Sequence, residues 1–111
     1  MIYEDISVND RNFPITRRFS ANSASTKKDG SLPYGMTIQN AVARAYDDQN
    51  NDVSAHLIAG TSVNGDLVKV FVNGSTEVQK ATYAINLNIT YASMAFTTKD
   101  CYVKLALIKI R

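Results

Sequence analysis

The chain has 111 residues, of which 45% are hydrophobic, so it is limited to a single domain with a modest core. Its formal net charge of +2 is too small to indicate a nucleic-acid-binding surface. No apolar run approaches the roughly eighteen residues of a membrane-spanning helix, so no membrane association is expected. The N-terminal residues MIYEDISVND lack the basic start and apolar run of a secretion signal, and the single Cys101 cannot form a disulfide within the chain. These features predict a protein made in a reducing cytoplasm.

The first 35 residues differ in texture from the rest. Their apolar side chains are scattered, and the run ANSASTKKDGS at 21–31 is small, polar and without periodicity. Only the segment from Ile15 to Phe19 has the pattern of a short strand. So polar a segment cannot by itself offset about 1 to 2 kcal/mol of backbone entropy per ordered residue. We therefore expect residues 1–35 to form an extended N-terminal arm, either mobile or ordered by a partner, ahead of a β-sandwich domain at 36–111.

The segment TIQNAVARAY at 37–46 opens the domain. Strand alternation places Ile38, Val42 and Tyr46 on one face and three alanines on the other. A helix competes, because alanine favours helices, but the β texture of the following segments favours a strand. The next stretch, YDDQNND at 46–52, has oxygen ligands but lacks the glycine and the distal glutamate of an EF-hand calcium loop. It predicts a connection between strands, with a looser calcium site as the alternative.

The dipeptide Asn64-Gly65 predicts a two-residue type I′ hairpin turn between two apolar runs. In this register Val63 lies opposite Asp66. The predicted core face of the hairpin then consists of Leu57, Ala59, Val68, Val70 and Val72.

Two further strands complete the domain. The segment 81–91 alternates cleanly, with Tyr83, Ile85, Leu87, Ile89 and Tyr91 on one face. The segment 101–110 has apolar residues on both faces, which indicates a central strand or one whose second face meets another chain. Five or six short strands with tight turns predict an all-β fold: a small antiparallel β-sandwich or a jelly-roll-like barrel.

Residues suited to catalysis are sparse. The single histidine, His56, has no nucleophile-elbow pattern to pair with, and one cysteine and one histidine cannot close a four-ligand zinc site. No glycine-rich phosphate loop is present. Cys101 fits a small apolar strand residue better than a reactive thiol. We expect no enzymatic activity, no metal site and no cofactor.

Two groups of residues are candidates for binding a partner protein. In the arm, aromatic anchors and arginine forks for carboxylates are the expected contacts, namely Arg11, Phe13, Arg17, Arg18 and Phe19. On the mixed face of the hairpin, Ile58 is expected opposite Phe71, as an apolar pair covered by the arm or by a partner.

The run NAVARAYDDQNNDVSAHLIAGTSVNGDLVKVFVNG, from Asn40 to Gly74, resembles Ig-like and jelly-roll accessory domains of tailed phages. The shared succession is a strand, an Asp/Asn turn, an NDVS re-entry and an NG hairpin, over about a third of the chain. With its length and N-terminal extension, the whole chain looks most like the capsid cement or staple proteins of short-tailed phages of the epsilon-fifteen type.

The resemblance implies a structural virion protein on the outer surface of a capsid, assembled in the host cytoplasm. Its partner would be a major capsid protein of the HK97-like fold. It would clamp neighbouring subunits as a homodimer and stabilise the shell against the pressure of packaged DNA. No catalytic residues are implied, whereas the arm would reach a neighbouring subunit and become ordered there.

Two other classes stay open. The first is a carbohydrate-binding or adhesion module of a phage tail or bacterial surface. It would have a calcium or sugar site near residues 47–52 and exposed tyrosines, such as Tyr46, Tyr91 or Tyr102, stacked on sugar rings. The second is a small inhibitor or adaptor that binds a host protein through a sheet edge.

Overall fold

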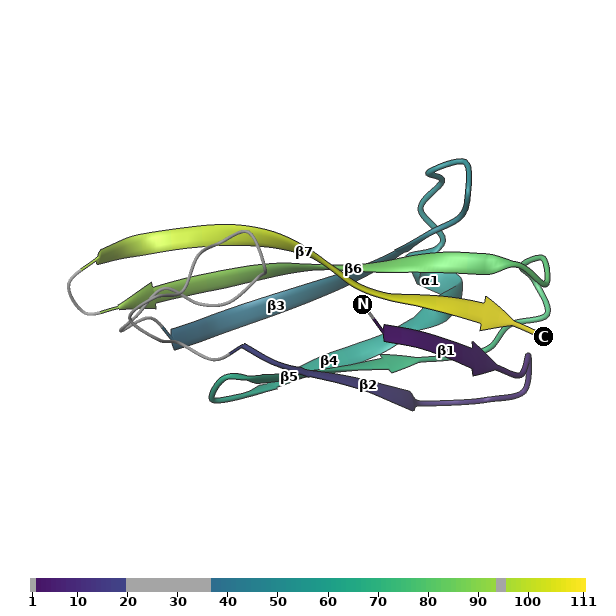
Figure 1. Cartoon of the computed structure of the whole chain (residues 1–111), viewed down its shortest axis with the longest axis horizontal. Helices are drawn as coiled ribbons and strands as arrows, with labels where there is room; N and C mark the ends of the chain where they lie inside the picture. Colours follow the sequence, from purple (N-terminus) through teal and green to yellow (C-terminus); the bar gives the residue numbers. More distant parts are fainter. Residues whose placement is uncertain (1, 20–36, 94–95) are drawn as a thin grey trace.

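The computed structural model describes residues 2–19, 37–93 and 96–111, which form two packed sheets (Figure 1). The elements are β1 (Ile2–Ile6), β2 (Phe13–Arg18), β3 (Thr37–Tyr46), α1 (Ser54–Leu57), β4 (Ile58–Asn64), β5 (Leu67–Val72), β6 (Thr82–Ser93) and β7 (Phe96–Ile110). One sheet has the order β1-β7-β6-β3 and the other β2-β5-β4. The predicted all-β sandwich is confirmed. Within the three described ranges, no helix is long and apolar enough to cross a membrane.

The strand order is that of an immunoglobulin-type sandwich. In that fold the second, fifth and fourth strands form one sheet, and the third, sixth and seventh form the other. Here the first strand joins the latter sheet, where it pairs parallel with β7. Tyr83, at the start of β6, donates its hydroxyl to the carbonyl oxygen of Gln79 at 2.7 Å. This contact has the geometry of the tyrosine corner found where strands five and six connect in such sandwiches.

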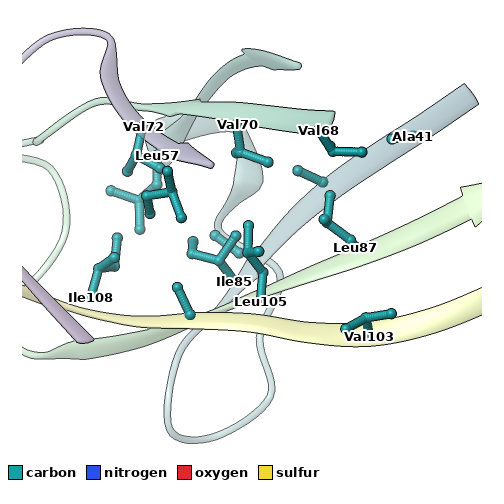
Figure 2. Close-up of a cluster of buried hydrophobic side chains, with 14 of the residues drawn as sticks. Ala41, Leu57, Val68, Val70, Val72, Ile85, Leu87, Val103, Leu105 and Ile108 are labelled. Atoms are coloured by element: carbon teal, nitrogen blue, oxygen red, sulfur yellow. The ribbon is translucent and has the colours of Figure 1, made fainter. Parts of the chain in front are cut away.

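The core lies between the inner faces of the two sheets (Figure 2). β6 contributes the five alternating residues predicted from the sequence, all of them buried. β3 turns its alanines inward, and these small side chains allow the edge strand β4 to come close. The Thr61 hydroxyl on β4 donates to the carbonyl oxygen of Ala41 on β3 at 3.1 Å, which closes this side of the sandwich.

Residues 2–19 belong to the sandwich, which corrects the prediction of a separate arm over this range. β1 pairs with the C-terminal end of β7, and β2 pairs antiparallel with β5. Ile6, Ile15 and Phe19 are at most 2% exposed. The prediction was wrong because it considered only the surface that the segment could bury by itself. In the sandwich, each of these strands needs only one row of inward apolar side chains, because the other strands provide the rest of the core. The remainder of the predicted arm, 20–36, lies outside the described residues.

A β-bulge explains why the sequence of β7 is apolar on both faces. Ile85 pairs with Ala106, but Asn86 pairs with Lys104, so Leu105 is the extra residue. Among the described side chains of β7, odd-numbered residues therefore point into the core before the bulge, and even-numbered residues do so after it. Both sequence faces contribute to one core, through Val103 and Leu105 up to the bulge and through Ala106, Ile108 and Ile110 after it. No second chain is needed to account for the pattern.

The β4–β5 hairpin forms as predicted, but its loop lies one residue further along the chain, so that Val63 pairs with Val68 rather than with Asp66. Asn64 pairs with Leu67, so the loop residues are Gly65 and Asp66. Gly65 has φ +63°, whereas Asp66 does not have a positive φ, which fits a type II′ turn with glycine first rather than type I′. β5 still buries its predicted valines, but Ala59 on β4 is exposed.

Candidate functional site

The two aromatic residues predicted as arm anchors are used inside the sandwich. Phe19 is 1% exposed, and its amide donates to the carbonyl oxygen of Asp66 at 2.7 Å. Phe13 is partly buried and packs against the core. The Phe19 ring is therefore not available to a partner, so its prediction as an anchor is wrong, whereas Phe13 is only partly buried and its role stays a prediction.

The three arginines of the predicted arm also contact their own domain. The Arg17 guanidinium lies 4.9 Å from the centre of the Phe19 ring, a cation–π geometry. Arg18 forms an ion pair of 2.8 Å with Asp66, and both side chains are substantially exposed. Arg11 donates through Nη1 to the carbonyl oxygens of Val8, Asp10 and Gly74, at 3.1, 2.8 and 3.0 Å. Arg11 therefore ties the turn after β1 to the end of β5, whereas Arg18 stays on the surface.

Ile58 and Phe71 are not brought together. The displaced loop, together with a break in the register between Ile58 and Gly60, places Ile58 opposite Val72, where it packs against the core. Phe71 points to the other side of the sheet, opposite Gly60 on β4 and Pro14 on β2. The prediction of an apolar pair is wrong, but the outward position of Phe71 is retained.

Phe71 is the centre of an apolar area on the outer face of the three-stranded sheet, which we call the Phe71 patch: Pro14, Gly60, Leu67 and Phe71. Phe71 and Leu67 are half-buried, and Pro14 is exposed. A Cβ added at Gly60 would meet nothing within 4 Å, so the space beside the ring is open. Pro14 has no N–H, which hinders strand addition at the β2 edge. The patch thus offers a face rather than an edge to a partner.

The opposite outer face, on the four-stranded sheet, is polar with a few exposed apolar groups. We call its central part the Asn face: Val42, Arg44, Asn86, Asn88, Tyr102 and Lys104. Cross-strand pairing sets Asn88 between Val42 and Tyr102, and Asn86 between Arg44 and Lys104. Tyr102 is 67% exposed and Val42 39%.

Both asparagines of this face carry an unsatisfied acceptor. Within the described part of the chain, the Oδ1 atoms of Asn86 and Asn88 are buried and have no hydrogen-bond partner. A buried acceptor without a donor lowers the stability of the fold by about 1 to 3 kcal/mol, so such groups are rare in folded proteins. A bound donor group would provide the missing partner.

The loop after β3 holds itself together by hydrogen bonds. Asp47 Oδ1 accepts from the backbone N–H groups of Gln49 and Asn51, at 2.9 and 2.8 Å, and Asn50 adopts a positive φ of 63°. The bond from the Asn51 backbone is the main cause that lowers the pKa of Asp47 below its usual value. Among the described residues, no group of three His, Cys, Asp or Glu side chains could hold a metal ion. The predicted strand connection at 46–52 is confirmed.

His56 lies in the four-residue helix α1 rather than in a strand. Its Nδ1 is 2.9 Å from a carboxylate oxygen of Glu77, and both side chains are well exposed. This contact joins α1 to the segment between β5 and β6 at the surface. The side chain of Cys101 lies outside the described part of the structure.

Sequence reasoning missed Pro14, Leu67 and the two asparagines. A proline inside an apolar pattern marks an edge strand, and that signal could have placed β2 at the rim of a sheet. The asparagines were visible as the polar positions of the alternating segment 81–91, but their burial depends on neighbours from two other strands. No family model, curated protein or solved structure matches the chain, so function has to be inferred from these surfaces.

Proposed function

We propose that the protein is a structural virion component that binds the outer surface of a phage capsid and clamps neighbouring subunits of the major capsid protein. The observation that carries this proposal is the Phe71 patch. An outward aromatic residue in the central strand of a sheet, flanked by proline and glycine, is the kind of anchor around which protein interfaces form.

The surroundings of the patch fit a protein partner. Lys69 lies between Phe71 and Leu67 on β5, and Arg18 lies opposite Leu67 on β2. Lys69 would pair with a carboxylate on the shell beside the apolar contact, whereas Arg18 is already paired with Asp66. Two such modules related by a local two-fold axis would bridge adjacent shell subunits and add a restraint at each bridge. Many copies on one lattice would reinforce the shell together.

The proposal does not assign the contact with the shell to residues 2–19 of the predicted arm. Because residues 2–19 complete the sandwich, they cannot also extend to a distant subunit. In this proposal the face of the three-stranded sheet provides the contact.

Cosedimentation with phage capsids stripped of accessory proteins tests the proposal. The variant Phe71→Ser should lose binding by at least about tenfold, because a buried aromatic anchor contributes 2 kcal/mol or more. Tyr3→Ser, which removes an aromatic side chain that is 72% exposed on the other sheet, is the matched control and should bind normally. Equal binding of both variants, with unchanged thermal unfolding, would rule out the Phe71 patch as the docking surface.

A second candidate, carbohydrate binding, is supported by the Asn face. An exposed tyrosine ring beside two carboxamides combines a stacking platform with hydrogen-bonding groups for hydroxyls. Of the tyrosines considered from the sequence, Tyr102 suits this role, whereas Tyr91 is 1% exposed and Tyr46 is half-buried. The proposed sugar site therefore moves from the loop at 47–52 to the sheet.

Titration with neutral and acidic oligosaccharides, followed by NMR, tests this candidate. Amide shifts confined to β3, β6 and β7, and lost in Tyr102→Ala but kept in Phe71→Ser, would support it. An absence of shifts at millimolar sugar would remove it. The two variants thus separate the two functions.

A further inference from the structure

The chain contains two Asn-Gly pairs, and the structure places them in contrasting surroundings. Asn64-Gly65 is at the tip of the β4–β5 hairpin, and Asn73-Gly74 follows the end of β5. An asparagine followed by glycine is prone to deamidation, because glycine has no side chain to hinder attack by its backbone nitrogen. In the folded protein, the reaction requires the asparagine Cγ and the glycine backbone nitrogen to be able to approach each other.

At the hairpin tip the reacting atoms are accessible. Asn64 is exposed, and it pairs with Leu67, so the ladder ends before the amide nitrogen of Gly65. A Cβ added at Gly65 would meet nothing within 4 Å, which shows that the space around the turn is open. Turns at a hairpin tip also fluctuate at low free-energy cost.

At the second pair both reacting groups are engaged. The Asn73 Oδ1 accepts a hydrogen bond of 2.9 Å from the backbone N–H of Asn12. The Gly74 N–H, whose nitrogen would attack, donates to the carbonyl oxygen of Asp10 at 2.8 Å. Gly74 is buried, and its backbone is packed against Ser7. Reaction here requires the N-terminal turn to detach first.

We propose that Asn64 is a site of spontaneous deamidation in the folded protein and that Asn73 is protected. The Gly65 backbone nitrogen, having lost its proton to a water-derived base, attacks Cγ of Asn64. The new N–Cγ bond closes a five-membered succinimide, the Cγ–Nδ2 bond breaks, and Nδ2 leaves as ammonia. Water then opens the ring at either carbonyl, giving aspartate or isoaspartate, and no electrons are gained or lost overall.

The modification alters the surface where it occurs. It removes one unit from the formal net charge of +2 and places a carboxylate next to the turn residue Asp66. Isoaspartate also adds a backbone atom at residue 64, directly before a two-residue loop whose length sets the register of the hairpin. Because Leu67 belongs to the Phe71 patch and pairs with Asn64, the change takes place at the rim of that patch. The inference itself does not depend on the proposed function.

Peptide mapping by mass spectrometry of the full-length protein, aged at mildly alkaline pH, provides the test. In the folded protein Asn64 should convert at least about tenfold faster than Asn73, since an opening cost of only ~1.36 kcal/mol at Asn73 gives that factor. In concentrated urea the two sites should convert at similar rates, because each is then an Asn-Gly pair in an unfolded chain. The Asn64→Gln variant should lose the fast phase and leave Asn73 unchanged.

The product identifies the route. A mixture of isoaspartate and aspartate at position 64 is expected, because only the succinimide yields the former. Equal rates at the two sites in the folded protein, or conversion of Asn64 without isoaspartate, would overturn the proposal.

Discussion

Gly74 lies where the end of β5 meets the turn after β1. A Cβ at this position would overlap the carbonyl oxygen of Ser7 and lie 2.7 Å from the carbonyl carbon of Val8. We expect Gly74→Ala to lower the free energy of unfolding by about 1 to 3 kcal/mol, the usual cost of overpacking. Gly60→Ala is the matched control, because its Cβ would meet nothing, and it should change stability by less than about 0.5 kcal/mol. Urea unfolding of both variants checks this, and equal stabilities would contradict the close packing at Gly74.

Replacing either of two buried tyrosines of β6 by phenylalanine should have opposite effects on stability. The Tyr83 hydroxyl donates to the carbonyl oxygen of Gln79, so Tyr83→Phe should cost about 0.5 to 1.5 kcal/mol of stability. The Tyr91 hydroxyl is buried and has no partner among the described residues, so Tyr91→Phe should be neutral or stabilising. Thermal unfolding of the two variants measures the difference. A loss of stability in Tyr91→Phe as large as that in Tyr83→Phe would contradict the unpartnered state of the Tyr91 hydroxyl.

The loop of Asp47 provides a prediction at the scale of an element. The folded protein lowers the pKa of this carboxyl, so its contribution to stability is complete above the ordinary value of 3.8 and is lost as the pH falls through the lower, folded value. Asp47→Asn should therefore flatten the acid limb of the stability curve, measured by urea unfolding at a series of acidic pH values. Asp48→Asn makes the same charge change in the same loop and should leave the limb steeper than Asp47→Asn does.

Among the elements, the sequence predicts strands well where one face is strongly apolar. β6 has this property, and its inward residues could be named in advance. β4 does not, because its apolar content is low, so burial does not specify its register. β5 buries the same valines in either register, which is why the hairpin could be predicted while the Ile58–Phe71 pairing could not. The bulge in β7 depends on its pairing with β6, which the alternation of β7 alone does not contain.

At the scale of the whole molecule, the sandwich is closed by contacts between the two ends of the chain. Ile2 pairs with Ala106, and the Arg111 N–H donates to the carbonyl oxygen of Ile6 at 2.9 Å. Residues so far apart in the sequence leave no local pattern when they pair. The sequence therefore could not show that residues 2–19 form two strands that pair with β7 and β5. For the candidate site, the outward position of Phe71 was predictable from alternation. Its neighbour Pro14 was not, because it comes from the segment expected to form the arm.

The proposed function depends on residues 2–19 being part of the sandwich. Because β1 and β2 are then held in the two sheets, a partner has to bind to the outer face of a sheet. Hydrogen exchange of the free protein, followed by NMR, tests the point most directly. The reporter is the Phe19 amide, which donates to the carbonyl oxygen of Asp66, together with the amides of β2 that face β5. We predict protection comparable with that of β5, since both strands open only with the sandwich. Exchange of these amides at the rate of an unstructured chain, while β5 stays protected, would contradict the account.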